Sequence, residues 1–555
     1  MTETKVKATL SNLDYGVFLG SLVIALAIGI YQAWKGRSRS QKELLVSSEG
    51  IHLFPITLSL IATYLSAILL LGVRILGSTL YVLQMTLYMG TALYAPVIAV
   101  SAVTDMPEWI AIIVAGGICT FYTAIGGLRA VVWTDAFQVG VMLLGVVTII
   151  VYGVIDVGGL SEVWRIAGEN HRATFFNWSL DPFERHAFIW VFLNVTTGWM
   201  LVHGGNQSSV QRYSSLRTLR EAKWAVLLNI PGVICLVSLA CFSGVVIFSN
   251  YAGCDPLKAG FISKKDQIIP YYVLDKLGHL KAVPGIFLAC LFSGALSTLS
   301  SGLNSLAAVT WQDALQFAPF AKKMSDNAAK NTIKIISLVF GIIAILFALY
   351  AGRLGSVLQV TVTVTGVIGA PLWVLMFTSV IFPFVNTTGV VVGTLSSLMA
   401  SCFLGFGSYA VHVPSPEILP TSIDECVANV TLAEPAISTL LSLEDDELGW
   451  KNIFRISYLL YQLIGMAVGL VVTIVVSLCL RGFVLDTTDP ALVHGWSISL
   501  FQKLGFGASR RSYDFGHEIS TNLSPHHKRQ STLSTVVLVS PQSQSSFSGA
   551  GEKAM

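Results

Sequence analysis

The sequence predicts an all-α membrane protein that crosses the bilayer many times, and three observations lead to this fold class. Hydrophobic residues make up 54% of the 555 residues, charged residues make up only 12%, and the mean hydropathy is +0.69. A soluble protein of this size would carry about a quarter charged residues. The apolar residues also occur in long continuous runs. The formal net charge of +3 is too small and too scattered to indicate a nucleic-acid partner.

Twelve of these runs are long enough, or nearly so, to span a bilayer. A hydrocarbon core about 30 Å thick takes roughly 20 residues of α-helix. Because the runs do not alternate in polarity, only helices can satisfy their backbone groups in lipid. We therefore expect about 12 apolar helices in a transmembrane domain at 15–482, after a tail at 1–14 and before a largely disordered cytoplasmic tail at 483–555. The runs are approximately 15–34, 51–72, 76–103, 109–126, 131–155, 187–204, 224–249, 283–310, 332–351, 357–382, 389–410 and 455–480.

Clusters of lysine and arginine predict which loops face the cytoplasm, because short cytoplasmic loops are enriched in these residues. Three such clusters lie between apolar runs, and further arginines and lysines follow Arg481. We therefore place these three loops and the C-terminal tail inside. The clusters are Lys35, Arg37, Arg39 and Lys42; Arg212, Arg217, Arg220 and Lys223; and Lys322, Lys323, Lys330 and Lys334.

Residues 156–186 and 412–450 are expected on the opposite side, because each segment contains an N-glycosylation sequon. The acceptors are Asn177 and Asn429. Further sequons, among them those at Asn194, Asn386 and Asn522, fall in expected membrane or cytoplasmic segments and should stay unmodified. A glycosylated multi-pass protein of this kind is expected in the plasma membrane.

Two of the eight cysteines, Cys254 and Cys426, lie in polar loops on the same expected outer side. An oxidising compartment allows such a pair to form a disulfide. The sequence leaves open whether the two are paired or are separate free thiols.

The basic loops conflict with the number of runs between them. Five runs separate the cluster at 35–42 from the cluster at 212–223, and five crossings would place these clusters on opposite sides. Either one run does not cross or a helix is missing. The conflict most directly concerns residues 51–103, where two apolar runs meet at Val73-Arg74 with no polar loop between them.

Several short motifs follow one another along the chain. They are LYAP at 93–96, YTAIGGLRA at 122–130, VVWTDAFQ at 131–138, NQSSVQRY at 206–213, CDP at 254–256 and FSGALSTLSSGLNSLAAVTWQD at 292–313. In this order they resemble the sodium/solute symporter family, in the branch of the monocarboxylate, multivitamin and iodide transporters. The resemblance covers about residues 8–482. It implies two inverted five-helix repeats, in which broken helices surround a mid-membrane site.

The resemblance also implies a function, namely sodium-coupled symport of a small organic anion by alternating access. Expected partners are sodium as the coupling ion, the lipid bilayer and an anion such as pyruvate, lactate, biotin or pantothenate. No cofactor is expected. No nucleophile and base are arranged as an enzyme would need, so enzyme chemistry is not expected either.

Two adjacent hydroxyl residues in an apolar run, Ser297 and Thr298, are candidate sodium ligands, and Gly294 lies one turn earlier. Hydroxyl oxygens and freed backbone carbonyls suit a hard cation. The resemblance implies that sodium binds here against carbonyls of a broken helix, at Leu65 and Ile68. The alternative is that both hydroxyls bond carbonyls of their own helix.

Asp135 is a second candidate, because a carboxylate beside an apolar run is costly and tends to mark an ion path. Gln138 lies three residues later and shares its helix face. The resemblance implies that these two residues bind an ion together with Ser66 and Gln207. The alternative is that Asp135 caps a helix that begins near Val131.

For the substrate, the resemblance implies that Tyr88 and Trp199 line the central cavity. Aromatic side chains in membrane helices also serve as packing alone, and this alternative stays open. The sequence shows no intramembrane arginine or lysine beyond Arg74 that could meet a carboxylate. An anionic substrate is therefore expected to rely on helix N-termini, hydroxyl groups and the sodium ions.

One part of the expected architecture is missing after Gly72. Members of the family continue there through the rest of a broken helix and another full helix, whereas this chain passes directly to Val73-Arg74. By bilayer length the loss amounts to roughly 60–70 residues, and it accounts for the conflict between loops and runs. We expect this form to transport poorly or not at all. The alternative function is a non-transporting member that regulates or assembles with a complete transporter.

Overall fold

Helices account for most of the residues that the structure describes, and none of those residues lies in a β-strand. The computed structural model describes residues 12–35, 74–104, 106–174, 176–184, 186–319, 321, 324–353, 357–382, 384–410, 419, 421–426 and 449–480. The chain divides into two units, of which the first holds residues 1–378 with 387–476 and the second holds 379–386 with 477–555. The expectations for the run 51–72, for Asn429 and for the tail from 483 lie outside the described residues.

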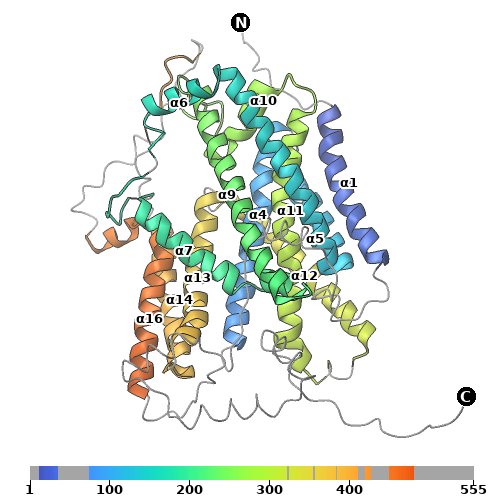
Figure 1. Ribbon diagram of the computed structural model, residues 1–555, viewed down its shortest axis with the longest axis vertical. Helices are drawn as coiled ribbons and strands as arrows, with labels where there is room; N and C mark the ends of the chain where they lie inside the picture. Colours follow the sequence, from blue (N-terminus) through green and yellow to red (C-terminus); the bar gives the residue numbers. More distant parts are fainter. Residues whose placement is uncertain are drawn as a thin grey trace, which may run out of the picture. The chain divides into compact units, whose positions relative to one another are not determined.

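The described helices follow the expected runs, with ends that differ by a few residues (Figure 1). They are α1 (Asn12–Lys35), α4 (Arg74–Val103), α5 (Glu108–Val157), α6 (Leu160–Glu169), α7 (Phe188–Gly204), α8 (Gln207–Ser214), α9 (Leu219–Asn250), α10 (Ile268–Leu277), α11 (Val283–Val309), α12 (Asp326–Ala351), α13 (Val357–Ile381), α14 (Thr387–Ala410) and α16 (Leu459–Leu480). Short 3-10 helices cover Lys265–Gln267, Leu315–Phe317 and Gly449–Arg455, and a π-helix covers Thr310–Ala314.

Within the described residues, nine helices are long and apolar enough to span a membrane, and α7 is a shorter apolar helix. Helix α5 contains two expected runs, 109–126 and 131–155, so eleven of the twelve runs are accounted for. The last run begins later than expected, at Leu459 rather than at 455. The residues just before α16 contact the loop between α6 and α7, since the Ser457 amide donates to the Pro182 carbonyl at 2.9 Å.

Two consecutive glycines explain why α5 holds two spans. Gly127 has φ 62° and ψ −166°, a backbone conformation that is essentially restricted to glycine. At Gly126 a side chain would collide with Ala130, and it would lie 3.2 Å from the Gly29 carbonyl of α1. The chain therefore turns at Gly127 and packs closely against α1 at the same place. We call this end of the first unit, marked by Gly127, the inner end.

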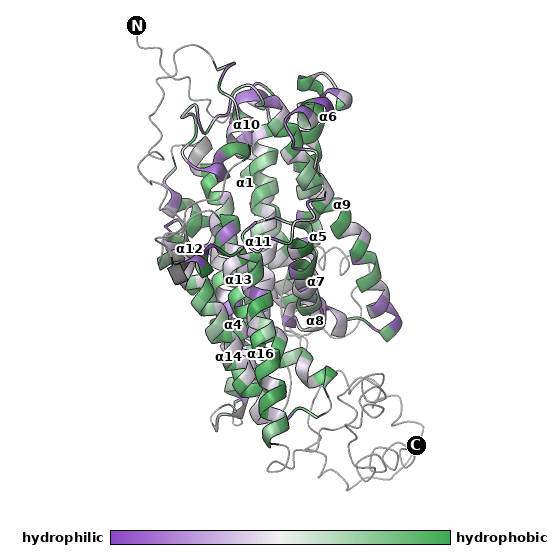
Figure 2. Ribbon diagram, turned by 90° about the vertical axis from the view of Figure 1, so that its left-hand side faces the viewer, coloured by the Kyte–Doolittle hydropathy of each residue, from purple (hydrophilic) through white to green (hydrophobic). Residues whose placement is uncertain are grey.

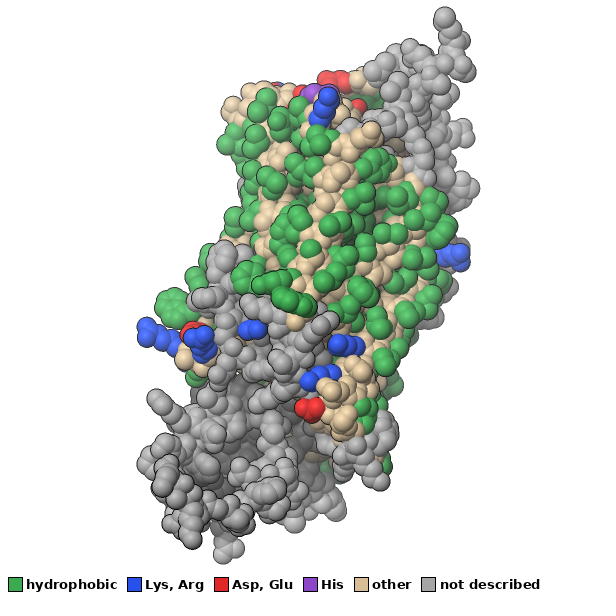
Figure 3. Space-filling model, turned by 90° about the vertical axis from the view of Figure 1, so that its right-hand side faces the viewer, with side chains coloured by type: hydrophobic (Ala, Val, Ile, Leu, Met, Phe, Trp, Pro, Cys, Tyr) green, Lys and Arg blue, Asp and Glu red, His purple; other side chains and the backbone are tan. Residues whose placement is uncertain are grey.

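Helix α11 is the centre of the first unit. It packs against α1, α4, α5 and α12, and 83% of its most apolar stretch is buried, against 17% for α9. Hydrophobic residues cover the outer helices along most of their length, whereas hydrophilic residues gather in the first turns of α9 (Figure 2). On the face shown in Figure 3, hydrophobic side chains form a broad band. This is the arrangement of a membrane protein, in which apolar faces meet lipid and polar groups are buried in the protein.

Contacts between helices show which helix ends lie together. At one end, the Gly285 amide of α11 donates to the Asp14 carboxylate of α1 at 3.2 Å. At the other end, Ser78 of α4 donates to Asp313, just beyond α11. Because α1 also reaches the Gly127 turn, the last residue of α1 and the first residue of α4 both lie at the inner end. Lys35 and Arg74, the helix ends on either side of this segment, therefore lie at the same end, as the basic loops require.

The opposite end, which we call the outer end, carries a disulfide. The structure joins Cys254 to Cys426 with their Cα atoms 4.9 Å apart. The Asp255 amide donates to the Ser422 carbonyl at 2.9 Å beside it. Helices α6 and α10 lie at this end (Figure 1), and Asn177, an expected glycan acceptor, is exposed in the loop between α6 and α7.

We expect Gly127→Ala to destabilise the protein by about 1–3 kcal/mol, because alanine must adopt a conformation that is essentially restricted to glycine. Thermal unfolding of the purified chain in detergent, followed by tryptophan fluorescence, measures the change. Gly117→Ala is the matched control, because Gly117 lies in the same helix with open space around it. Equal melting temperatures for both variants would show that the turn at Gly127 is not strained by a side chain.

Glycosylation tests which side the loop after α6 occupies. Asn177→Gln should remove one glycan step from the chain expressed in animal cells, as seen by gel mobility before and after glycosidase treatment. Asn386→Gln should leave the pattern unchanged, because Asn386 is buried and donates from its amide to Ser477. An unaltered pattern for Asn177→Gln would contradict the outer placement of this loop.

Candidate functional site

The polar residues of α11 form a buried stripe through the centre of the first unit. Buried hydroxyl and amide groups need hydrogen-bond partners, so a stripe of this kind must be matched by polar groups on neighbouring helices. Those groups come from α4, α5 and α8. The members of the stripe are Ser297, Thr298, Ser300, Ser301, Asn304 and Ser305, all of them buried.

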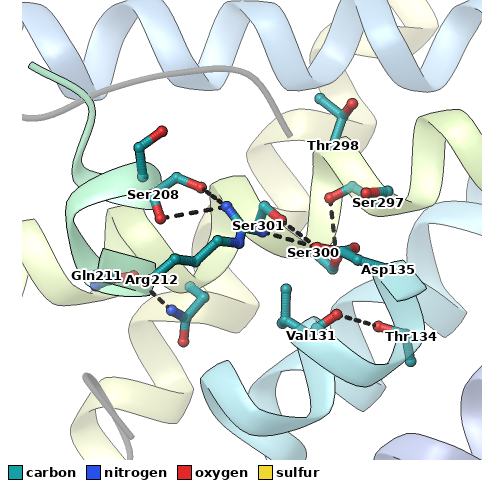
Figure 4. A network of polar contacts seen from close by, with 12 residues as sticks. Val131, Thr134, Asp135, Ser208, Gln211, Arg212, Ser297, Thr298, Ser300 and Ser301 are labelled. Atoms are coloured by element: carbon teal, nitrogen blue, oxygen red, sulfur yellow. Dashed lines mark hydrogen bonds and ion pairs between the residues drawn. The ribbon is translucent and has the colours of Figure 1, made fainter. Parts of the chain in front are cut away.

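A buried ion pair crosses from α8 to α5 beside this stripe (Figure 4). The Arg212 Nη2 atom lies 2.8 Å from Asp135 Oδ2, and the two side chains are 1% and 0% exposed. The same Nη2 donates to Ser301 Oγ at 2.6 Å, and Ser301 Oγ donates to Asp135 Oδ2 at 3.2 Å. Nη1 of Arg212 donates to Ser208 Oγ at 2.6 Å. Guanidinium, carboxylate and hydroxyl thus form one closed network.

The position of Arg212 corrects the sequence prediction in two respects. We expected it in a cytoplasmic loop, and we expected no intramembrane arginine beyond Arg74 to meet a carboxylate. The other three members of that basic cluster, Arg217, Arg220 and Lys223, are exposed. Arg212 differs because it lies in α8, where its side chain turns into the protein. The signal that could have found it is Asp135 itself, since a buried carboxylate requires a counter-charge.

Helices α7 and α8 follow each other directly, with a break of only two residues between them. The interruption lies at Gly205 and Asn206, and Asn206 has an extended backbone with a side chain that accepts from the Ser209 amide. This is an N-cap, which starts a new helix after the break. Across the break, the ring nitrogen Nδ1 of His203 lies 3.0 Å from the Tyr213 hydroxyl. The described residues thus include one broken helix of the kind that we expected.

The alternative role for Asp135, as a helix cap, is not what the structure shows. The second span of α5 begins after the Gly127 turn, so Asp135 lies about two turns inside it. Its carboxylate contacts Arg212 and Ser301 on other elements. The side chain that bonds locally is Thr134, whose hydroxyl donates to the Val131 carbonyl at 2.9 Å.

The first candidate sodium ligands lie on α11 as expected, with local contacts of their own. Thr298 Oγ1 donates to the Gly294 carbonyl at 3.1 Å, as the alternative for hydroxyls in a helix predicted. The Ser297 carbonyl accepts from Ser300 Oγ at 3.1 Å. Tyr88 of α4, a candidate substrate residue, interacts through its side chain with that of Thr298. The structure thus brings a candidate substrate residue and a candidate ion residue together.

Gln138 lies at the level of Thr298, which follows from the way α5 and α11 run against each other. Asp135 contacts Ser301, and Met142 is packed against Gly294. In an antiparallel pair, Gln138 between these two contacts lies at the level of Thr298, next to Ser297. Gln138 is 1% exposed, and neither atom of its carboxamide has a hydrogen-bond partner among the described residues. A ligand that accepts or donates hydrogen bonds, or an ion, would satisfy such a group.

Two of the remaining predicted residues lie on α7 and α8, and the other three lie outside the described residues. Gln207 is the first residue of α8 and is half-buried. Trp199 of α7 stacks on His203, with ring centroids 5.2 Å apart. Leu65, Ser66 and Ile68 lie outside the described residues.

Three contacts that sequence reasoning did not predict extend the polar stripe toward the inner end. Asn304 Nδ2 donates to Gln211 Oε1 at 2.8 Å. The Tyr81 hydroxyl of α4 bonds Ser305, and beyond α11 the carboxylate of Asp313 accepts from Ser78. The stripe therefore continues from the level of Gly294 to the end of α11.

The chemistry of these groups suits a hard monovalent cation. Hydroxyl, carboxamide, carboxylate and carbonyl oxygens dominate the site, and such oxygens favour alkali and alkaline-earth ions over soft metals. Within the described part of the chain, no group of three or more histidine, cysteine, aspartate or glutamate side chains could hold a metal ion. The site therefore offers single oxygens spread over several helices.

Comparison with known proteins shows which family the chain resembles. The profile of the Sodium:solute symporter family matches residues 73–396, more than half of the chain. The chain is 32% identical to "Sodium-coupled monocarboxylate transporter 1" of Homo sapiens, over 84% of this chain and 87% of that protein. It is 32% identical to "Sodium-coupled monocarboxylate transporter 2" of Danio rerio over 83% and 84%. It is 31% identical to "Sodium-dependent multivitamin transporter" of Oryctolagus cuniculus over 95% and 92%.

The same comparisons contain positions that have no counterpart in this chain. The alignment with the human protein has 535 positions, whereas 84% of this 555-residue chain is about 466 residues, so about 69 positions face no residue here. The alignment with the rabbit protein, with 596 positions over 95% of the chain, leaves the same number. The family profile begins to match at residue 73.

A solved structure of a Na+-coupled sialic acid symporter, in a substrate-bound outward-open state, shares the fold. Its TM-score is 0.62 at 17% identity, and the match covers 84% of this chain and 98% of that one. The likeness supports the fold, and the family match and the relatives above 30% identity support membership. The chain is a multi-pass membrane protein and not an enzyme, and it belongs to the sodium:solute symporter family.

Proposed function

We propose that this chain is a sodium-coupled symporter, weakly active in this form, for a small organic anion of the monocarboxylate or carboxylated-vitamin type at the plasma membrane. The observation that carries the proposal is the buried stripe of oxygens on α11, faced by Asp135 and Gln138 of α5. Polar groups are expensive at the centre of an apolar bundle, and they persist where they serve an ion or solute path. The named relatives transport monocarboxylates and vitamins with sodium, which favours that class of solute.

Two groups of residues are proposed to hold sodium. The first is Ser297, Thr298 and Gly294 on α11, with Leu65 and Ile68. Its hydroxyl and carbonyl oxygens match the needs of a hard cation. The second is Asp135 and Gln138, with Ser66 and Gln207, and it supplies the charged ligand that the first group lacks. The unpartnered carboxamide of Gln138, at the level of Thr298, supports an ion or an ion-bound solute between the two groups.

The substrate is proposed to bind beside Tyr88 and Trp199, and pyruvate, lactate, biotin and pantothenate are the candidates. Tyr88 interacts with Thr298, so a solute at Tyr88 would lie next to the first sodium group. That proximity offers a physical basis for coupling. A carboxylate beside a bound sodium ion gains attraction in a medium of low dielectric constant, so each ligand strengthens the binding of the other.

The aligned positions that have no counterpart in this chain favour a second candidate function for this form. About 69 aligned positions have no counterpart here, and the family profile begins immediately after Gly72. The family resemblance implies that these positions would hold one half of a broken helix and the next full helix. We infer that the form transports less well than a complete relative, and that it regulates or assembles with one.

Uptake of labelled pyruvate and biotin, in sodium and in choline, separates these functions. We expect little sodium-dependent uptake for the chain at the cell surface. We expect clear uptake when the roughly 69 corresponding residues of the human relative are inserted between Gly72 and Val73, because the insert restores the missing spans. Insertion of a glycine-serine linker of equal length is the control. Full uptake by the chain itself would refute the non-transporting candidate.

Sodium binding tests the first ion group without transport. Sodium should raise the melting temperature of the purified chain relative to choline, because a ligand that binds the folded state stabilises it. Ser297→Ala should weaken the apparent sodium affinity by about tenfold, the effect of losing one good oxygen ligand. Ser293→Ala is the matched control, a buried serine one turn earlier on α11. Equal sodium responses for the two variants would remove Ser297 from the site.

A further inference from the structure

The guanidinium of Arg212 occupies the place that a cation at Asp135 would take. Its Nη2 atom lies 2.8 Å from Asp135 Oδ2 and 2.6 Å from Ser301 Oγ, so it contacts a charged and a neutral oxygen at once (Figure 4). Both oxygens are of the kind that sodium needs. The guanidinium therefore already binds the two oxygens that the proposed ion would need.

Charge makes the two cations exclusive. In a fully buried site, one carboxylate balances one positive charge, and a second cation beside it would be repelled in a medium of low dielectric constant. Asp135 and Arg212 are 0% and 1% exposed, so water screens neither of them. A sodium ion that uses Asp135 must therefore displace the guanidinium from the carboxylate.

We propose that Arg212 is a tethered cation that competes with the coupling sodium ion for Asp135. This inference rests on the proposed function, in which Asp135 binds sodium. Without the ion, the guanidinium neutralises Asp135 and holds α8 against α5 and α11. When sodium is bound, the carboxylate of Asp135 coordinates sodium instead of Arg212, and α8 loses that attachment. Arg212 is thus a positioning residue, through which ion binding at Asp135 changes how α8 is held.

The construction of α8 fits this role. It has eight residues and follows the interruption at Gly205 and Asn206, so its position does not depend on a continuous helix. Its other polar attachments are Gln211 to Asn304 and Tyr213 to His203, and neither contains a full charge pair. The Arg212 contact is therefore the one attachment of α8, among those described here, that a monovalent cation can replace charge for charge.

Ser208 provides a way to test this without leaving Asp135 unpaired. Its hydroxyl accepts from Arg212 Nη1 at 2.6 Å and so orients the guanidinium from within α8. Ser208→Ala should weaken the hold of Arg212 on Asp135 while it keeps both charges. Ser209→Ala is the matched control, because Ser209 is an equally buried neighbour whose side chain interacts with Tyr213.

The experiment is a sodium titration of the purified full chain in detergent, read by thermal unfolding and by equilibrium binding of radioactive sodium. We expect Ser208→Ala to raise the apparent sodium affinity about threefold. Arg212→Lys should raise it about tenfold, because the amine loses the forked geometry that meets Asp135 and Ser301 together. Ser209→Ala should not change it, and Asp135→Asn should lower it.

The sodium-free stability separates competition from a structural role. A purely structural ion pair predicts lower melting temperatures in choline for Ser208→Ala and Arg212→Lys, with unchanged or weaker sodium affinity, and that result would overturn the competition. If the unaltered chain itself shows no sodium binding, the proposed function fails and the competition fails with it. Sodium binding that is present but insensitive to both substitutions leaves the function standing and rejects the role of Arg212.

Discussion

The interaction on which the rest of this site depends is the neutralisation of one buried carboxylate. Asp135 lies inside an apolar bundle with no exposed surface, and such a charge is tolerated only with a counter-charge and hydrogen bonds. Arg212 and Ser301 supply both, and they come from two other elements. Satisfying one side chain therefore fixes α5, α8 and α11 in a common arrangement. Any ion that enters the site must do so by replacing part of that arrangement.

The central position of α11 follows from the same constraint. A helix with six hydroxyl or amide residues along one stripe cannot face lipid, so it must be surrounded by helices that carry matching groups. Its small residues also let neighbours approach closely, as where Gly302 packs against Met85 and Met89 of α4. The outer helices, α9 above all, are free to present apolar side chains instead. The polar stripe thus determines which helices are inside and which are outside.

Hydropathy could predict most of the helices, because the length of an apolar run in lipid is set by the bilayer itself. At the paired glycines 126–127 the backbone turns, and this separates two of the predicted runs within α5. The break at Gly205 and Asn206 was not readable from hydropathy, since a short polar interruption looks like a loop. For this reason Arg212 was counted with the exposed arginines that follow it. A rule that counts positive charges cannot distinguish a loop residue from one that a broken helix turns inward.

The proposed missing segment and the proposed ion residues lie in different parts of the chain, so a shortened form can retain one without the other. Asp135, Gln138, Arg212 and Ser297 belong to α5, α8 and α11, all of which are present and packed together. Leu65 and Ile68, by contrast, precede the junction at Gly72 directly. In the proposed function, the helix that would support their carbonyls is among the positions without a counterpart in this chain. Recognition of a cation by α5 and α11 and movement of a solute are then separable, because the first needs a buried cluster of oxygens and the second needs both broken helices.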